Sequence, residues 1–417
     1  MLADRLYDAI ISQPSHPWTS GASHLYTREF FTMVKERLEP EGVFVQWMGL
    51  GFVDDELLRG LVGTLSDVFE HLVVLAPGGQ LGSGAILFLS SDAPLALLES
   101  AETGLSVARD GFARVGVHTV EDIATSIVLE DEAARRFAGA SPRITDDHNH
   151  LAWSAGRMKQ GRARRNSIEA ALGAHDVLLA RAGDLNSDLM VRGLLQKEAM
   201  ARAKALANSL RGAAQASARG WVALKMSGPQ GAIRHFQRAL ELDPNHRPAI
   251  LGLAILRPEE IDLQALEPRE LGIVEAVAHR KEQDWKAVAG YEEALADWEA
   301  GSLLHSEAVR MRVGWRLDTG DPQHARDALA LLDQLIPRHK GIANLLLRAE
   351  ASAGAGLDDF GWASLDRVLT RLKSRPPRSR AYAIRALNSS RRLDNIAGAQ
   401  RTIRGLEAIA GFPANSR

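Results

Sequence analysis

The sequence has no cysteine among its 417 residues. This absence excludes disulfide bridges, thiol catalysis and cysteine-ligated metal sites, although it does not identify a compartment. Long apolar runs are missing too, because charge or glycine interrupts each of them before the roughly 18 residues that a membrane-spanning helix needs. No basic region followed by an apolar segment stands near Met1. We therefore expect a cytoplasmic protein, with a membrane link only through a hydrophobic segment upstream of this sequence.

A strong charge of either sign is also lacking. The chain carries 50 Lys and Arg residues against 52 Asp and Glu residues, which gives a formal net charge of −2. We therefore expect no nucleic-acid partner, since bulk electrostatic attraction to phosphates is absent. The length predicts two or three domains, each large enough to bury a core of its own.

The first informative pattern in the sequence is an apolar segment close to the N-terminus. Residues Leu6 to Ile11 are almost continuously apolar, which is typical of a strand covered on both faces in a parallel sheet. Ligands of such sheets bind beyond the carboxyl ends of the strands. The segment that follows the strand, Gln13 to Trp18, is therefore the first place at which we expect a ligand.

Helical and strand patterns alternate in the next part of the chain. Leu25 to Leu38 has helical spacing, and Gly42 starts an apolar strand that runs to Trp47. Asp54 or Asp55 can cap a second helix. The other expected elements are strands at His71 to Ala76 and Ala85 to Leu89, and helices at Pro94 to Ala101 and Val120 to Phe137. Together they predict the second half of a doubly wound α/β sheet.

From about Asn166 onward the pattern is all-α, with alanine and leucine at helical spacing. One segment resembles a tetratricopeptide (TPR) repeat through Gly220, Ala232, Phe236, Ala239 and Pro244. Weaker copies stand at Ala287, Tyr291 and Ala294, at Ala325, Leu329, Leu332 and Pro337, and around Ala363, Leu365 and Leu369. The resemblance covers residues 210 to 410 and implies a TPR-like α-solenoid, whose groove would bind a protein or peptide partner.

The N-terminal part resembles a known enzyme family, the spermidine synthase-like (polyamine aminopropyltransferase-like) branch of the Rossmann-type methyltransferases. A Tyr-Asp-x-Ile-Ile strand leads there to a Pro-Ser-Asn-Pro-Trp loop, and a Thr-Asp-Asp motif comes late. The matching segments here are Tyr7 to Trp18, Gly21, Leu25 to Phe31, Leu38 to Trp47, and Thr145 to Asp147. The resemblance covers residues 1 to 157. It divides the chain into an α/β domain at 1–157, a helical linker region at 158–209 and a TPR-like domain at 210–417.

The resemblance also implies a cofactor, a substrate and a site. The cofactor would be S-adenosylmethionine or its decarboxylated form, and the substrate would be a polyamine. The residues expected to bind substrate or cofactor are Ser12, Pro14, Ser15, Pro17, Trp18, Gln46, Trp47, Asp146 and Asp147. The residues expected at the catalytic positions are Gln13 and His16.

Two departures from the family pattern bear on activity. No glycine-rich loop precedes Tyr7, whereas the family binds the cofactor at such a loop, where backbone N–H groups can approach a ligand. Gln13 stands where the family has a carboxylate, and an amide cannot act as a general base near neutral pH. His16 replaces the Asn of the family loop and could shuttle protons, although a loop histidine is more often simply solvated.

Structural interpretations of the same residues remain open. Trp18 could fill a gap in the core, Gln46 and Trp47 could pack beneath the sheet, and Asp8 could pair with a backbone amide. Arg28 and Glu29 suit an ion pair at the start of a helix, with Arg28 able to clamp the loop or the Thr-Asp-Asp turn. A further cluster, Asp146, Asp147, His148 and His150, fits a polar turn better than a metal site, so we expect no bound metal.

Two functions therefore remain, one enzymatic and one not. The first is an aminopropyltransferase-like enzyme, in which an amine attacks the carbon beside a sulfonium centre. The second is a non-catalytic scaffold, in which a vestigial transferase half-domain is joined to a TPR-like region that binds a partner. Because a half sheet would leave a strand edge unpaired, we also predict a homodimer, aggregation or a missing N-terminal segment.

Overall fold

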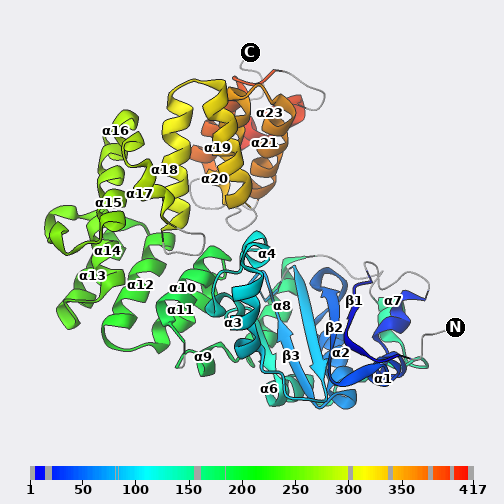
Figure 1. Cartoon of the computed structure of the whole chain (residues 1–417). Helices are drawn as coiled ribbons and strands as arrows, with labels where there is room; N and C mark the ends of the chain where they lie inside the picture. Colours follow the sequence, from blue (N-terminus) through cyan, green and yellow to red (C-terminus); the bar gives the residue numbers. More distant parts are fainter. Residues whose placement is uncertain are drawn as a thin grey trace. The chain divides into compact units, whose positions relative to one another are not determined.

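The computed structural model describes most of the chain. The described residues are 5–14, 21–79, 81–82, 84–154, 161–183, 185–298, 304–336, 341–373, 379–394 and 399–411. They fall into two compact units, one formed by Met1–Arg109 with Val117–Gly228 and the other by Asp110–Gly116 with Pro229–Arg417. The first unit contains a sheet and helices, whereas the described part of the second is helical (Figure 1). The coarse expectation of an α/β part followed by an all-α part is thus confirmed.

The sheet of the first unit has five strands in the order β1-β2-β4-β3-β5. Their bounds are β1 Tyr7–Ser12, β2 Leu38–Gly49, β3 His71–Leu75, β4 Ala85–Ser91 and β5 Ile127–Glu130. β1 and β2 are parallel, and each of the other three pairings is antiparallel. Since β3 and β2 both run antiparallel to β4, the strands β1, β2 and β3 all point the same way. Their carboxyl ends therefore lie at one edge of the sheet.

The expected strand-helix-strand unit is present between β1 and β2. Its helix is α1, Arg28–Lys35, and the Thr27 side chain caps this helix by accepting a hydrogen bond from Phe30 N. The next helix, α2 (Asp55–Val68), is capped by Asp54, whose carboxylate accepts from Leu57 N. The two expected strands after α2 are confirmed as β3 and β4, which pair as antiparallel neighbours.

The expected single helix at Val120 to Phe137 is wrong. That segment folds as a short helix α5 (Val120–Ala124), the strand β5 and a second helix α6 (Asp131–Ala138). Thr125 ends α5, and the apolar residues after Ser126 are all buried in the strand. Asp131 then restarts a helix with a positive φ of 30°. A buried strand of four residues leaves no periodicity from which it could be told apart from a helix.

The expectation that β1 is covered on both faces is also wrong. In the described part of the chain β1 pairs with β2 alone and forms one edge of the sheet. Ile11 is 73% exposed and Leu6 is 45% exposed. The apolar run therefore reflects a strand with one covered face, to which Ile10 contributes by packing on the core.

The core of this unit lies on the face of the sheet that α1 and α2 cover. Phe44, Met48 and Phe88 point into it and are fully buried. Phe44 stacks against Phe69 at 6.0 Å between ring centroids. The other face carries a smaller cluster around Val73, Leu75 and Ile127. Coverage of the sheet is therefore unequal on its two sides.

The helices after the sheet are tied to it by hydrogen bonds. They are α7 His150–Ser154, α8 Arg162–Gly173, α9 Leu178–Arg181, α10 Ser187–Gln196, α11 Met200–Ser209 and α12 Gly212–Met226. Two helices precede β5: α3 (Leu97–Val107) in this unit, and α4 (Arg109–Arg114), most of which is assigned to the second unit. Arg202 of α11 donates to the carbonyl oxygens of Thr125 and Ile127. Val177 N donates to Val128 O at 3.0 Å. Residues 161–209 therefore pack as part of the sheet-containing unit.

The second unit is built from helices that pack in sequence order. They are α13 Pro229–Leu242, α14 Arg247–Leu256, α15 Pro268–Lys281, α16 Trp285–Ala289, α17 Glu292–Ala296, α18 His305–Asp318, α19 Pro322–Leu335, α20 Ile342–Gly354, α21 Asp358–Leu372, α22 Ser379–Ser390 and α23 Ala399–Ala410. From α18 to α23 each helix contacts the next one, and α18, α20 and α22 also contact one another in turn. This is the neighbour-on-neighbour packing of a helical array.

The repeat-like residues lie where small side chains are needed. Ala232, Phe236 and Ala239 are buried in α13, and a Cβ at Gly252 of α14 would stand 2.6 Å from Phe236 Cζ. The next weak copy is divided at Gly290, which separates α16 from α17. The later copies are buried at Ala325, Leu329, Leu332, Leu365 and Leu369, whereas Ala363 is exposed and Pro337 lies outside the described residues.

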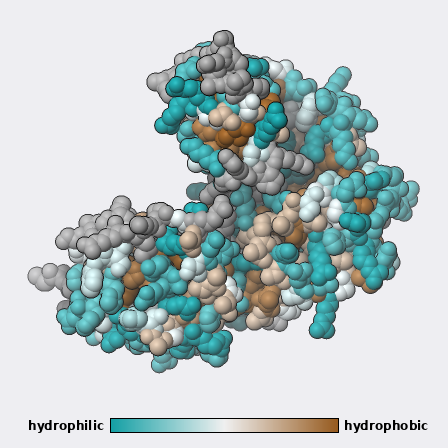
Figure 2. Space-filling model, turned by 180° about the vertical axis from the view of Figure 1, so that it is seen from behind, coloured by the Kyte–Doolittle hydropathy of each residue, from teal (hydrophilic) through white to brown (hydrophobic). Residues whose placement is uncertain are grey.

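The surface is mainly hydrophilic, with small apolar patches on the face drawn in Figure 2. Among the described residues the large exposed apolar side chains include Ile11, Trp153, Met226 and Phe360. Within those residues, no helix is both long enough and apolar enough to cross a membrane.

Candidate functional site

The parallel strands β1 and β2 bring two predicted site residues together at their carboxyl ends. Ser12 and Gln46 are direct partners in the β1–β2 register. Pro14 and Trp47 follow them on the same edge. This edge is where open α/β sheets bind their ligands. The sequence pattern predicted that the second strand ends at Trp47, whereas β2 continues to Gly49.

Gln46 is fully buried and only partly satisfied. Its Nε2 donates to Ser12 O at 3.3 Å and to Trp47 O at 3.0 Å. These two bonds fix the orientation of the amide, because both acceptors are carbonyl oxygens and only the nitrogen can donate to them. The Oε1 atom is buried and has no hydrogen-bond partner. A buried acceptor without a donor is uncommon and requires an explanation.

Tyr26 closes the other side of this edge. It belongs to a short 3-10 helix, η1 (Ala22–Tyr26), and its ring is completely buried. The hydroxyl is shared between Trp47 O at 3.2 Å and Pro14 O at 3.4 Å. Burial raises the pKa of this phenol far above its ordinary value, and a hydrogen bond with the Gln46 side chain acts in the opposite direction. Tyr26 is thus a neutral donor that joins the loop after β1 to the end of β2.

The Thr-Asp-Asp turn docks onto the same corner. Asp146 Oδ1 lies 2.9 Å from His24 Nδ1, and Asp146 N donates to Glu29 Oε2 at 3.0 Å. The hydrogen bond from His24 holds the pKa of the Asp146 carboxyl below its usual range. Just before the turn, Ile144 N donates to the buried Thr64 hydroxyl, and Ile144 O accepts from Arg28 N. The turn is therefore anchored on α1 and α2.

The remaining predicted site residues have mixed outcomes. Gln13 is described and exposed, as is Asp147. Ser15, His16, Pro17 and Trp18 lie outside the described residues. Trp47 is half-buried and its ring packs edge-on against Phe52 at 6.4 Å. At the helix start it is Glu29, rather than Arg28 through its side chain, that holds the Thr-Asp-Asp turn.

The histidines after Asp147 form a polar turn. His148 N donates to Thr145 Oγ1 at 3.1 Å, and the His150 ring lies 5.5 Å from that of Trp153. Across the part of the chain that the structure describes, no three His, Asp or Glu side chains gather in an arrangement that could hold a metal ion. The cluster is thus accounted for by local hydrogen bonds.

The S-adenosyl group that the family resemblance implies does not fit the described residues. Among the described residues a glycine-rich connection follows β3, at Gly78, Gly79, Gly82 and Gly84, but it leads into the antiparallel strand β4 instead of a helix N-terminus. Gly49, at the end of β2, has a packing role, since a Cβ there would lie 2.8 Å from the Phe52 ring.

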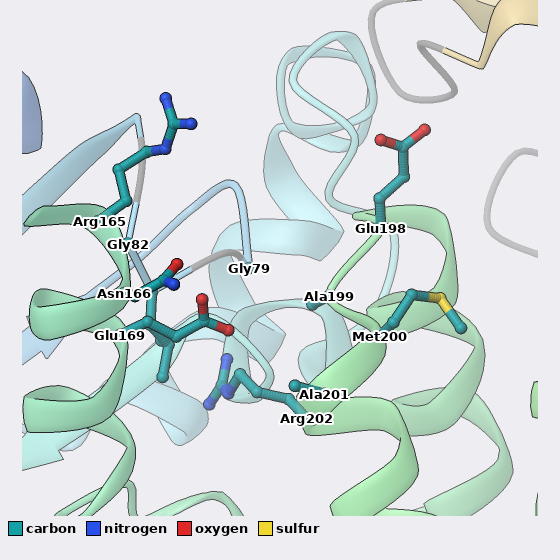
Figure 3. Close-up of a pocket in the computed structure, with 11 residues that line it drawn as sticks. Gly79, Gly82, Arg165, Asn166, Glu169, Glu198, Ala199, Met200, Ala201 and Arg202 are labelled. Carbon is teal, nitrogen blue, oxygen red and sulfur yellow. The ribbon is translucent and has the colours of Figure 1, made fainter. Parts of the chain in front are cut away.

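A cavity lies after the carboxyl end of β3 and was not expected from the sequence. It has a volume of about 440 Å³ and lies between the β3–β4 connection, α8 and the start of α11. Glu169 and Arg202 point toward one another in it, whereas Arg165 and Glu198 point away (Figure 3). Gly82 allows the approach, because a Cβ there would meet Arg165 O at 2.5 Å. The three wall segments are far apart in the sequence, so no local pattern indicates the cavity.

Behind this cavity three cationic side chains are buried against α5. Lys197 Nζ donates to Asp122 O at 2.6 Å, to Ser126 Oγ at 2.8 Å and to Thr125 Oγ1 at 3.1 Å. Burial lowers the pKa of Lys197 to about 8. Arg202 pairs with Asp176 at 2.7 Å, and Arg192 with Asp122 at 3.4 Å. These contacts fasten α10 and α11 to the sheet, although Nε and Nη1 of Arg192 are buried without a hydrogen-bond partner.

Comparison with known proteins finds no matching family model, no matching curated protein and no matching solved structure. Three residues at the edge were missing from the predicted site, namely Tyr26, His24 and Glu29. Tyr26 and Glu29 lie within the segment Leu25 to Phe31 that carries the family resemblance, which was a signal for them. No signal indicated His24.

Proposed function

We propose that the α/β part of the chain binds polyamine-class amines and is a spermidine synthase-like, aminopropyltransferase-related domain. The observation that carries this proposal is the buried Gln46 Oε1, an acceptor without a donor at the carboxyl ends of two parallel strands. A ligand that donates N–H groups would satisfy it. An unsatisfied buried acceptor costs about 1 to 3 kcal/mol, so a donor at this atom contributes to affinity.

The charges around the edge support a cationic ligand. Asp146 and Glu29 meet at the anchored turn, and Asp147 is exposed beside them. Carboxylates accept hydrogen bonds from ammonium groups, and such charge-assisted bonds are stronger than neutral ones. An amine with several ammonium groups could therefore contact the turn while one N–H group reaches Gln46.

Transfer chemistry is not part of the proposal for the described residues. Gln13 supplies no base, and the described residues offer no site for the sulfonium donor. We accordingly propose amine binding within this family, without aminopropyl transfer by this chain alone.

Calorimetric titration tests the proposal. Spermidine and putrescine are titrated into the full chain, alongside hexamethonium, a dication without N–H donors. We expect saturable binding of spermidine and none of hexamethonium. Equal binding of both would show that charge alone attracts the ligand, and absence of spermidine binding would refute the proposal. Parallel titrations with S-adenosylmethionine, its decarboxylated form and methylthioadenosine test the missing nucleoside site.

The Gln46→Glu variant sharpens the test, because it keeps the oxygen acceptors but loses the two N–H bonds to Ser12 O and Trp47 O. Its matched control is Gln237→Glu, which changes a half-buried glutamine of the second unit whose Nε2 donates to Glu260. We expect spermidine affinity to change in the first variant only. A change of the same size in both would assign the effect to net charge.

A second function, partner binding by the TPR-like region, is favoured by one observation. The helices α18, α20 and α22 stack in turn, which is the arrangement that presents a groove to a peptide in helical repeats. Selection from a displayed random-peptide library tests it. We expect one shared motif whose binding slows hydrogen exchange in these helices, whereas unrelated peptides without local protection would refute this function.

A further inference from the structure

We propose that His24, oriented by Asp146, is the proton acceptor for the bound amine and takes the place of the carboxylate that Gln13 lacks. This inference rests on the proposed amine binding and adds a residue and a protonation state to it. Its basis is the pair of atoms His24 Nδ1 and Asp146 Oδ1, 2.9 Å apart.

The pair determines which nitrogen of His24 carries the proton. An ionised carboxylate can only accept hydrogen bonds, and the pKa of Asp146 is lowered. Neutral His24 must therefore hold its proton on Nδ1. The Nε2 atom is left with a lone pair, and the structure shows no hydrogen-bond partner for it within the described residues. His24 is exposed, so this lone pair is open to a ligand.

Both partners are held in place by their backbones. His24 O accepts from Thr27 N and from the Thr27 hydroxyl at 2.9 Å. Asp146 N is bound to Glu29, as described above. An exposed pair usually loses side-chain freedom when it forms, but here the turn and the 3-10 helix are fixed before the ligand arrives.

The His24–Asp146 pair also lies beside the sheet edge at which Ser12 of β1 and Gln46 of β2 are partners. His24 and Tyr26 share the five-residue helix η1, and the Tyr26 hydroxyl reaches Pro14 O and Trp47 O. The same short helix therefore contacts the ends of β1 and β2 with one side chain and the Thr-Asp-Asp turn with another. An elongated polyamine can extend from one to the other.

The proton transfer is balanced without any further reactant. An ammonium N–H of the ligand gives its proton to His24 Nε2, which leaves a neutral amine and an imidazolium. Asp146 stabilises the imidazolium through the existing hydrogen bond, as a carboxylate does for a catalytic histidine. Within the described residues, Glu29 contacts Asp146 N, and Arg28, Asp147 and His148 are the charged or titratable residues next to this contact in the sequence.

The test combines a spectroscopic and a binding measurement on the full chain. Long-range ¹H–¹⁵N correlation at pH 8 reports the tautomer of His24, and we expect the proton on Nδ1. Spermidine affinity is then measured between pH 5 and 8, the range in which imidazoles take up a proton. We expect it to fall about fivefold on acidification, since two unit charges about 4 Å apart in water repel by about 1 kcal/mol.

Four variants separate the contributions. His24→Gln is expected to lose the pH dependence of spermidine affinity. Asp146→Asn is expected to lose the preference of His24 for the Nδ1 tautomer. His71→Gln is the matched control, because His71 makes a similar pair with Asp131 at 3.1 Å but lies at the start of β3, on the opposite edge of the sheet. His148→Gln controls for the neighbouring imidazole. Both controls are expected to keep the wild-type profile.

The outcomes distinguish the two proposals. Spermidine binding with an unchanged pH profile in His24→Gln would overturn the role of His24 and leave the amine site standing. A proton on Nε2 of His24 at pH 8 would also overturn that role. Absence of spermidine binding to the wild-type chain would overturn the amine site, and the role of His24 with it.

Discussion

Lys197 provides a quantitative test of how α10 and α11 are fastened to the sheet. Its Nζ is enclosed by Asp122 O and by the hydroxyls of Thr125 and Ser126. Burial is the main cause of its lowered pKa, and the nearby Arg202 and Arg192 lower it further, against the attraction of Asp122. The protonation of this one side chain therefore differs between the folded and the unfolded chain.

The sign of the pH effect follows from proton counting. The pKa is about 8 in the folded chain against an ordinary value of 10.5. Between these two values the unfolded chain holds the proton and the folded chain does not, so the free energy of unfolding rises with pH. From pH 7 to pH 9.5 the expected rise from this group is about 2 kcal/mol.

Urea unfolding of the wild type and of Lys197→Met measures the effect. Comparing the two proteins at each pH cancels the groups that they share. The measurements stay below about pH 10. Above that pH the unfolded phenol of Tyr26 ionises, and its raised pKa in the folded chain then makes the folded chain less stable. Lys204→Met on the exposed face of α11 is the control and should follow the wild type. A difference between wild type and Lys197→Met that stays constant from pH 7 to pH 9.5 would refute the reasoning.

Three further predictions concern packing, association and capping. Gly252→Ala should lower the free energy of unfolding by about 1 to 3 kcal/mol, because the new Cβ would stand 2.6 Å from Phe236 Cζ. Gly341→Ala is the control in the same thermal unfolding assay and should be tolerated, because its Cβ meets no atom within 4 Å. The unpaired edge at β1 predicts a homodimer by light scattering that Ile11→Lys converts to a monomer; a wild-type monomer would count against it. Asp54→Ala should cost about 1 kcal/mol through the lost cap of α2, and unchanged urea unfolding would contradict this.

The elements that could be predicted from the sequence are those with long, regular patterns and local caps. The strand-helix-strand unit and α2 belong to this class, since Asp54 and the apolar spacing act within a few residues of one another. β5 could not be predicted, because its three buried apolar residues, Ile127 to Leu129, are too few to show a period of their own. The exposure of β1 depends on which strand lies beside it, and apolar composition alone does not report that.

The candidate site shows the same division. Ser12 and Gln46 could be placed at one edge, because the carboxyl ends of parallel strands meet there. The contact of His24 with Asp146 joins residues 122 positions apart, and no spacing rule covers such a pair. The cavity beside α11 likewise depends on tertiary packing of three segments.

A crystal structure of the chain with spermidine tests the amine site most directly. The account predicts a ligand nitrogen within hydrogen-bond distance, about 3 Å, of Gln46 Oε1, with a second nitrogen at the turn that carries Asp146. A spermidine-saturated crystal in which Gln46 Oε1 is met by water or by the protein alone, with no amine at this edge, would contradict it.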